Sequence, residues 1–197
     1  MKGKLFVLLG ESCSGKSTLE RKIHEYGLCN KVVSMTTRKP RSNEENGEDY
    51  YFVDNITFGI YKAQEKFLES TYYTMQNEGL VQYGILKYDV KLDKGNYVCV
   101  LNPMGYEQAI KSLGKENVVG IYIDREPKER FLSYLDRESR DFNKLLSEAW
   151  TRYNKDLEDF VGITDKVDYV ITNTSVDDMI FHFMNIFNIE NSNYDKN

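Results

Sequence analysis

The chain has 197 residues and a mass of 23.1 kDa, which suits one domain with insertions rather than two large independent domains. Hydrophobic residues make up 41% of the sequence, enough for a sizeable core, so disordered and fibrous proteins are excluded. The net charge of −5 provides no overall positive field to attract nucleic acid, so any anion must bind at a local site.

The first predicted element is a strand over residues 5–9, a continuous apolar run that ends at Gly10. Such a run is typical of a strand covered on both faces of a parallel sheet, and it is too short for a signal peptide or a membrane span. Leu19, Ile23 and Tyr26 then recur at helical spacing. The chain therefore opens with a strand, a glycine-bounded loop and a helix.

Between this strand and this helix lies the pattern G-x-x-x-x-G-K-[ST], beginning at Gly10. Its backbone N–H groups can surround polyphosphate at a helix N-terminus, its lysine can reach the β and γ oxygens, and its last hydroxyl can bind Mg²⁺. We therefore expect a site for ATP with Mg²⁺, the metal ligand being Ser17. The predicted ATP-binding residues are Gly10, Glu11, Ser12, Cys13, Ser14, Gly15, Lys16, Ser17 and Thr18.

Residues 35–90 interrupt the alternation of strands and helices, because they are rich in tyrosine and in turn-forming residues. They predict an inserted subdomain. Within it, Arg38 and Arg41 lie three residues apart around Pro40, with Tyr50 downstream. Two guanidinium groups and a tyrosine hydroxyl suit a phosphate dianion, which they hold by charge-assisted hydrogen bonds.

The alternation resumes after the insertion. Runs rich in β-branched residues at 97–101, 118–123 and 169–172 predict strands, while 106–113 and 127–135 predict helices. Together with the first strand they indicate an α/β fold with an open, mostly parallel sheet flanked by helices. A last amphipathic helix is predicted from the apolar positions Met179, Ile180, Phe183 and Ile186.

The polar stretch 136–155 predicts a helical excursion from the sheet, and the polar residues 190–197 predict a frayed tail. The single domain 1–197 thus divides into a core (1–34, 91–135 and 156–189), the insertion, the excursion and the tail. The cysteines, Cys13, Cys29 and Cys99, are too few and too widely spaced for a disulfide framework or a metal-binding pair, so we expect reduced thiols and a cytoplasmic location.

The stretch Ser34-Met35-Thr36-Thr37-Arg38-Lys39-Pro40-Arg41, followed by Glu44, Gly47 and Asp49-Tyr50-Tyr51-Phe52-Val53, resembles the acceptor-binding signature of the guanylate kinase family. Phe67-Leu68-Glu69, Tyr83-Gly84, the arginine-bearing excursion and Val167 to Asn173 extend the resemblance over nearly the whole chain. It implies a P-loop NTPase fold whose insertion binds the nucleoside monophosphate (NMP) and whose excursion is a helical lid.

The resemblance also implies roles for individual residues. Residues expected at the GMP site are Ser34, Arg38, Arg41, Tyr50, Glu69, Tyr83 and Asn102, with Ser34 and Glu69 facing guanine. Residues expected to act in phosphoryl transfer are Lys16 and the lid arginines Arg137, Arg140 and Arg152, the choice between Arg137 and Arg140 being open.

The sequence also departs from the family pattern. Val100 and Asn102 replace two carboxylates, and Ile85 replaces a hydroxyl residue. The stretch from Glu69 to Tyr83 is longer than usual, so Tyr72 and Tyr73 compete with Tyr83 as phosphate ligands.

The predicted function is ATP-dependent phosphorylation of GMP or dGMP, with no nucleic-acid or membrane partner. Two alternatives come from different classes. One is a kinase for another nucleoside monophosphate or a ribose bisphosphate, which the changes at Ile85 and Asn102 keep open. The other is a non-catalytic interaction module, and the intact Gly15, Lys16 and Ser17 argue against it.

Overall fold

The computed structural model describes residues 2–41, 44–75, 79–136 and 142–192, and within these ranges the strands form two sheets. The larger is a five-stranded sheet in the order β2-β7-β1-β8-β9, with every neighbouring pair parallel. Its strands are β1 (Leu5–Leu9), β2 (Asn30–Lys31), β7 (Tyr97–Val100), β8 (Val118–Asp124) and β9 (Tyr169–Thr172). The α/β prediction with a parallel core sheet is confirmed.

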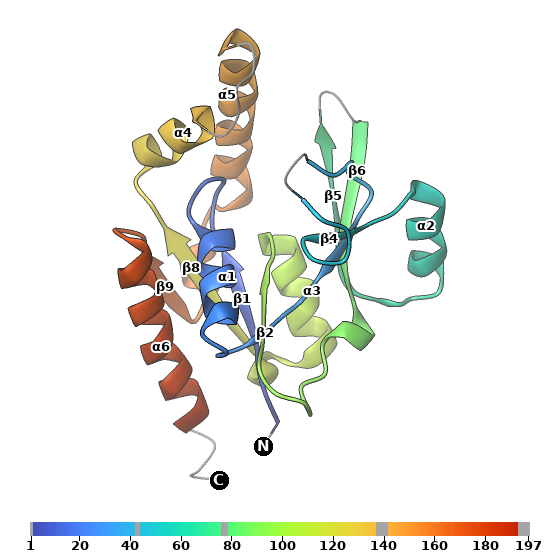
Figure 1. Cartoon of the computed structure of the whole chain (residues 1–197), viewed down its shortest axis with the longest axis vertical. Helices are drawn as coiled ribbons and strands as arrows, with labels where there is room; N and C mark the ends of the chain where they lie inside the picture. Colours follow the sequence, from blue (N-terminus) through green and yellow to red (C-terminus); the bar gives the residue numbers. More distant parts are fainter. Residues whose placement is uncertain (1, 42–43, 76–78, 137–141, 193–197) are drawn as a thin grey trace.

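Helices cover both faces of this sheet (Figure 1). On one face, α1 (Lys16–Glu25) and α6 (Val176–Ser192) pack against alternate residues of the central strands, including Phe6 and Leu8. On the other face, α3 (Pro103–Leu113) contributes Tyr106 and Ala109 to a second apolar cluster. Because both faces are covered, all five side chains of β1 are buried, which explains its unbroken apolar sequence.

The second sheet has the order β4-β3-β6-β5 and lies to one side of the core (Figure 1). It is built from β3 (Ser34–Thr36), β4 (Tyr50–Phe52), β5 (Phe67–Met75) and β6 (Gly79–Leu86), with α2 (Asn55–Ala63) packed on it through Phe58. It is fastened to α3 by polar contacts: Ser112 donates to the Leu68 carbonyl (2.8 Å), and the Gln108 side chain bonds both the N–H and the carbonyl of Ser70.

Helices α4 (Pro127–Leu135) and α5 (Phe142–Asp159) extend from the core beyond the end of β8 (Figure 1). Arg130 of α4 is only 5% exposed and lies between two carboxylates, Glu11 (3.6 Å) and Asp156 (3.8 Å). A guanidinium this deeply buried needs opposite charges around it. It therefore connects α4, α5 and the loop after β1.

Two predictions at helix ends are wrong. Helix α1 ends at Glu25, and Tyr26, expected on its packed face, is 60% exposed. Helix α6 continues to Ser192, beyond the predicted start of the tail, because Glu190 is held by an ion pair with Lys4 and a hydrogen bond from the Tyr169 hydroxyl.

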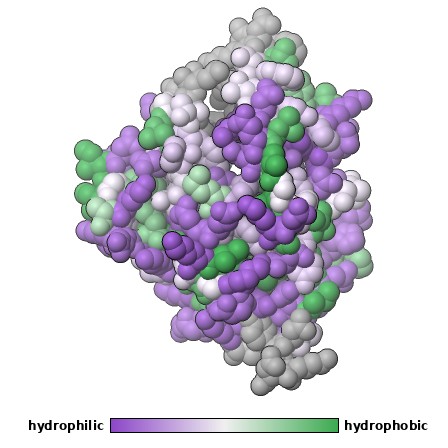
Figure 2. All heavy atoms as spheres, turned by 180° about the vertical axis from the view of Figure 1, so that it is seen from behind, coloured by the Kyte–Doolittle hydropathy of each residue, from purple (hydrophilic) through white to green (hydrophobic). Residues whose placement is uncertain are grey.

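Seen from behind, hydrophilic side chains cover most of the surface, and hydrophobic ones are scattered among them (Figure 2). Among the helices of the described ranges, none is both long enough and apolar enough to cross a membrane.

Candidate active site

The loop between β1 and α1 has a backbone that requires both of its glycines. Gly10 has a φ of +146°, and a Cβ there would lie 2.6 Å from the carbonyl oxygen of Ile123. Gly15 has a φ of +106°, and a Cβ there would lie 2.5 Å from the side-chain nitrogen of Asn173. The two fixed glycines of the motif therefore match two positions that no other residue fills without strain.

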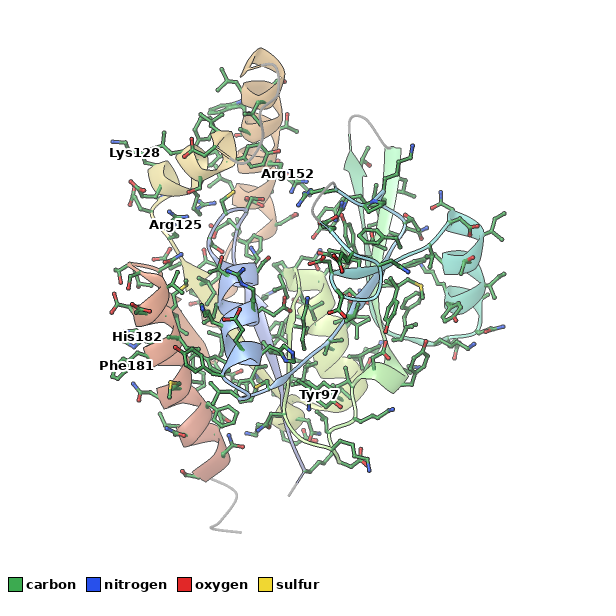
Figure 3. All side chains as sticks on the ribbon, in the orientation of Figure 1. Tyr97, Arg125, Lys128, Arg152, Phe181 and His182 are labelled. Carbon is green, nitrogen blue, oxygen red and sulfur yellow. The ribbon has the colours of Figure 1, made fainter. Side chains whose placement is uncertain are left out.

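Three distant side chains brace this loop. Asp156 of α5 accepts from the Ser12 N–H (2.7 Å), Asn173 donates to the Ser14 carbonyl (2.7 Å), and Arg125 donates to the Cys13 carbonyl (3.0 Å). Figure 3 shows Arg125 beside the end of β8. Sequence reasoning gave none of the three a role. For Arg125 and Asn173 a signal existed. Asn173 directly follows the predicted strand 169–172, Arg125 lies two residues after the predicted strand 118–123, and the carboxyl ends of parallel strands share one edge of the sheet.

Lys16 and Ser17 lie at the first turn of α1, where the backbone N–H groups favour negative charge. The Lys16 ammonium donates to the carbonyl oxygens of Gly10 and Glu11, each at 2.7 Å, so it lies over the loop. Ser17 is exposed, and Thr18 follows it in the same turn. The Glu11 side chain instead accepts from the Tyr122 hydroxyl, which leaves its backbone as the part that can contact a phosphate.

These features fit a magnesium-bound triphosphate. The loop leads into the N-terminus of α1, where backbone N–H groups favour phosphate oxygens, and an exposed hydroxyl at Ser17 suits a hard cation. Among the described residues, no cluster of three or more His, Cys, Asp or Glu side chains has the arrangement of a metal cage. Mg²⁺ commonly retains several water ligands and needs few from the protein, so such a cage is not required.

Across from α1, the insertion brings Arg38 and Arg41 to one carboxylate. Glu44 accepts from Arg38 (2.7 Å) and lies 3.7 Å from Arg41. Arg38 is 5% exposed, and its guanidinium carbon lies 5.4 Å from the ring centroid of Tyr50. The motif contained Glu44, but sequence reasoning gave it no role; its carboxylate holds both guanidinium groups together.

Strand register decides which tyrosines approach this pair of arginines. Tyr83 lies 5.9 Å from both Tyr50 and Tyr73, measured between ring centroids. Because side chains alternate along β5, Tyr73 shares a face with Glu69, whereas Tyr72 lies on the other face and is 61% exposed. Tyr73, and not Tyr72, is therefore the neighbour of Tyr83.

Glu69 is a buried carboxyl with one of its two oxygens unpartnered within the part of the chain that the structure describes. It is 3% exposed; Oε1 accepts from the Ile85 N–H (3.0 Å), and Oε2 has no partner among the described residues. Burial raises the pKa of Glu69 to about 8. Oε2 lies over the first turn of α3, since a Cβ at Gly105 would be 2.9 Å from it. A ligand that donates hydrogen bonds would satisfy this oxygen.

The remaining predicted acceptor residues flank Glu69 and the tyrosines. Ser34, the first residue of β3, is partly buried and is paired with Tyr50. Asn102 is the N-cap of α3, and its side-chain oxygen accepts from the Gly105 N–H (2.8 Å). Its carbonyl therefore caps the helix, while the other end of the amide interacts with the Tyr73 hydroxyl.

Of the three predicted lid arginines, the structure describes Arg152. It is exposed on α5 (Figure 3). Its guanidinium carbon lies 6.0 Å from the ring centroid of Tyr134, and it lines a small cavity together with Ser12. Arg137 and Arg140 lie outside the described residues.

A phosphate-binding loop at the carboxyl ends of the strands of a parallel sheet, with an arginine-bearing subdomain opposite, defines a P-loop nucleotide phosphotransferase. The model of the family described as guanylate kinase matches residues 2–190, and this chain belongs to that family.

Individual relatives agree with this assignment. The chain is 31% identical to a guanylate kinase of Thermus thermophilus, over 87% of this chain and 78% of that protein. It is 30% identical to a guanylate kinase of Wolbachia pipientis wMel, over 95% of this chain and 90% of that protein. The crystal structure of guanylate kinase from Anaplasma phagocytophilum has the same fold, with a TM-score of 0.72 and 24% identity over 96% of this chain and 86% of that one.

Proposed function

We propose that this protein transfers the γ-phosphoryl group of ATP to GMP or dGMP. The observation that carries the proposal is the pairing of two anion sites in one member of this family: the loop at Lys16, and the pair Arg38 and Arg41 on the insertion. The insertion, residues 35–90, then serves as the acceptor subdomain, and residues 136–155 serve as the lid.

Transfer between two phosphates requires positioning and charge neutralisation more than acid–base chemistry. The acceptor is a phosphate oxygen that is already largely ionised near pH 7, so no general base is needed. Arg38, Arg41, Tyr50 and Tyr83 would hold the acceptor phosphate. The loop N–H groups and Lys16 would hold the donor, and Arg152 would approach the transferred group.

Ser17 would hold Mg²⁺ together with ATP oxygens and water. When bound, the ion neutralises charge that develops on the phosphoryl oxygens. Closing of the lid would exclude water, which is a competing acceptor.

Guanine selectivity is assigned to Glu69. When ionised, its carboxylate accepts hydrogen bonds only, and guanine presents donors at N1 and at its amino group. Adenine and cytosine present a lone pair at the corresponding ring nitrogen and would leave the buried charge unpaired. Because Ile85 is fully buried in the core and Asn102 caps α3, we expect Ser34 to be the remaining donor to the base.

The state of the cysteines supports a proposal for the cellular compartment of the protein. Cys13, Cys29 and Cys99 are unpaired and buried. This arrangement suits a reducing compartment, and we place the enzyme in the cytoplasm.

A coupled assay of ADP formation with GMP, dGMP, AMP, CMP and dTMP tests the assignment. We expect turnover with GMP or dGMP to exceed the others clearly. Equal or better turnover with AMP, CMP or dTMP would overturn the guanine assignment and leave the kinase assignment intact. No turnover with any acceptor would overturn both.

A further inference from the structure

Helix α1 carries a carboxylate close to the donor site that the mechanism above does not use. Glu20 lies three residues after Ser17 and four after Lys16, so all three occupy neighbouring positions on one side of the helix. Side chains on a helix lean toward its N-terminus, which directs the long Glu20 side chain back over the turn that bears Ser17.

The surroundings of Glu20 place it between the core and the acceptor subdomain. Its charge interacts with Lys31 at the end of β2, with Tyr50 of β4 and with Cys99 of β7. The Lys31 ammonium donates to the backbone carbonyl of Glu48 (2.8 Å). Among the described residues, the Glu20 carboxylate has no hydrogen-bond or ion-pair partner within contact distance.

A buried, ionised carboxylate raises the free energy of the folded protein unless a cation or a hydrogen-bond donor binds it. Burial raises the pKa of Glu20 to about 7, even though Lys31 opposes the shift. The apolar side chain of Val100, at the end of β7, packs against the same cluster as Leu19 and Ile23 of α1. Strand β7 thus ends in an apolar side chain facing α1, and the carboxylate on this side comes from the helix.

We propose that Glu20 is a positioning residue for the magnesium ion of MgATP: its carboxylate accepts a hydrogen bond from a water ligand of the ion, while the Ser17 hydroxyl binds the ion directly. The inference rests on the proposed function, because it requires ATP at the loop. Mg²⁺ retains water ligands in most nucleotide sites, and outer-shell groups that orient a metal's ligands affect its affinity by about 10- to 100-fold.

The test is a titration of Mn²⁺ into the enzyme–ADP complex, followed by electron paramagnetic resonance. We expect Glu20→Gln, which keeps the shape of the side chain, to weaken Mn²⁺ binding about tenfold. Glu25→Gln is the matched control, because it removes the same charge from an exposed position in the last turn of the same helix. It should change Mn²⁺ affinity less than twofold.

Two further measurements separate positioning of the metal from a structural role. ADP affinity in the absence of metal should be unchanged in Glu20→Gln, and Glu20→Asp should retain Mn²⁺ affinity better than Glu20→Gln does. Equal Mn²⁺ affinity in Glu20→Gln and Glu25→Gln would overturn the proposal, as would an equal loss of metal-free ADP affinity. Failure of the proposed function is distinguishable, because the unmutated protein would then bind Mn²⁺ and ADP but show no turnover with GMP.

Discussion

The buried carboxyl of Glu69 makes a quantitative prediction about the pH dependence of acceptor binding. Its pKa of about 8 means that, at pH 7, only about one molecule in eleven carries the ionised group. In the proposed site, guanine donors bind the ionised form, because Oε1 already accepts from the Ile85 N–H and a proton on Oε2 would oppose a second donor. When only a fraction of the protein is competent to bind, the apparent affinity falls by that fraction.

GMP affinity is therefore expected to depend on pH through the ionisation of Glu69. Raising the pH ionises Glu69, so GMP affinity should rise, by about eightfold between pH 7 and pH 8.5. Ionisation of the GMP phosphate contributes little to the change in affinity between pH 7 and pH 8.5, because its second pKa is about 6 and it is already mostly a dianion at pH 7. Burial raises the pKa of Tyr50 to about 12, so this tyrosine does not titrate in the window.

Isothermal titration calorimetry provides the assay. Dissociation constants for GMP are measured between pH 7 and pH 8.5, in buffers of different ionisation enthalpy, for the parent and for Glu69→Gln. At pH 7, binding to the parent should release close to one proton, whereas the variant should release almost none and bind with a flat pH profile. A flat profile in the parent, without proton release, would refute the assignment of Glu69 to the base.

Four further substitutions test the rest of the site. Lys16→Met should leave the protein folded by circular dichroism and lower turnover at least about 10²-fold, because a preorganised charge at the transferring group is lost; parent-like turnover would remove Lys16 from the mechanism. Steady-state kinetics should show that Arg41→Ala raises the KM for GMP while Arg152→Ala mainly lowers kcat, and the same pattern for both would contradict the division into acceptor and lid sites. Asp156→Ala should lower stability by about 1–3 kcal/mol in urea unfolding, because the Ser12 N–H loses its acceptor and the buried Arg130 loses a counter-charge; an unchanged midpoint would show that this link adds nothing to the folded state.

Local patterns predicted the core of the fold and the donor loop. The apolar run of β1 and the two glycines of the loop are dictated by burial and backbone sterics within a few residues, so the sequence reveals them. The choice between Tyr72 and Tyr73 depends on the register of β5 with β6, which no local pattern fixed.

Long-range partners were beyond the reach of sequence patterns. Asp156 lies 144 residues from Ser12 in the sequence, and the local sequence around neither residue predicts their hydrogen bond. The end of α6 is similar, because Glu190 continues the helix through contacts with Lys4, which precedes β1, and with Tyr169 of β9. Glu20 was also missed, since a glutamate on a helix that starts at a phosphate loop is an ordinary surface residue unless the insertion is seen beside it.

The cap at the start of α3 limits how the acceptor pocket can change. The Asn102 oxygen holds the Gly105 N–H, in the same turn over which the Glu69 carboxylate lies. A side chain introduced at position 102 to recruit a different base must therefore also cap a helix, which confines useful choices to Asp, Ser, Thr and Asn. Any library that retunes the proposed guanine site is best built on those four residues at position 102, with the wider diversity placed at Ser34.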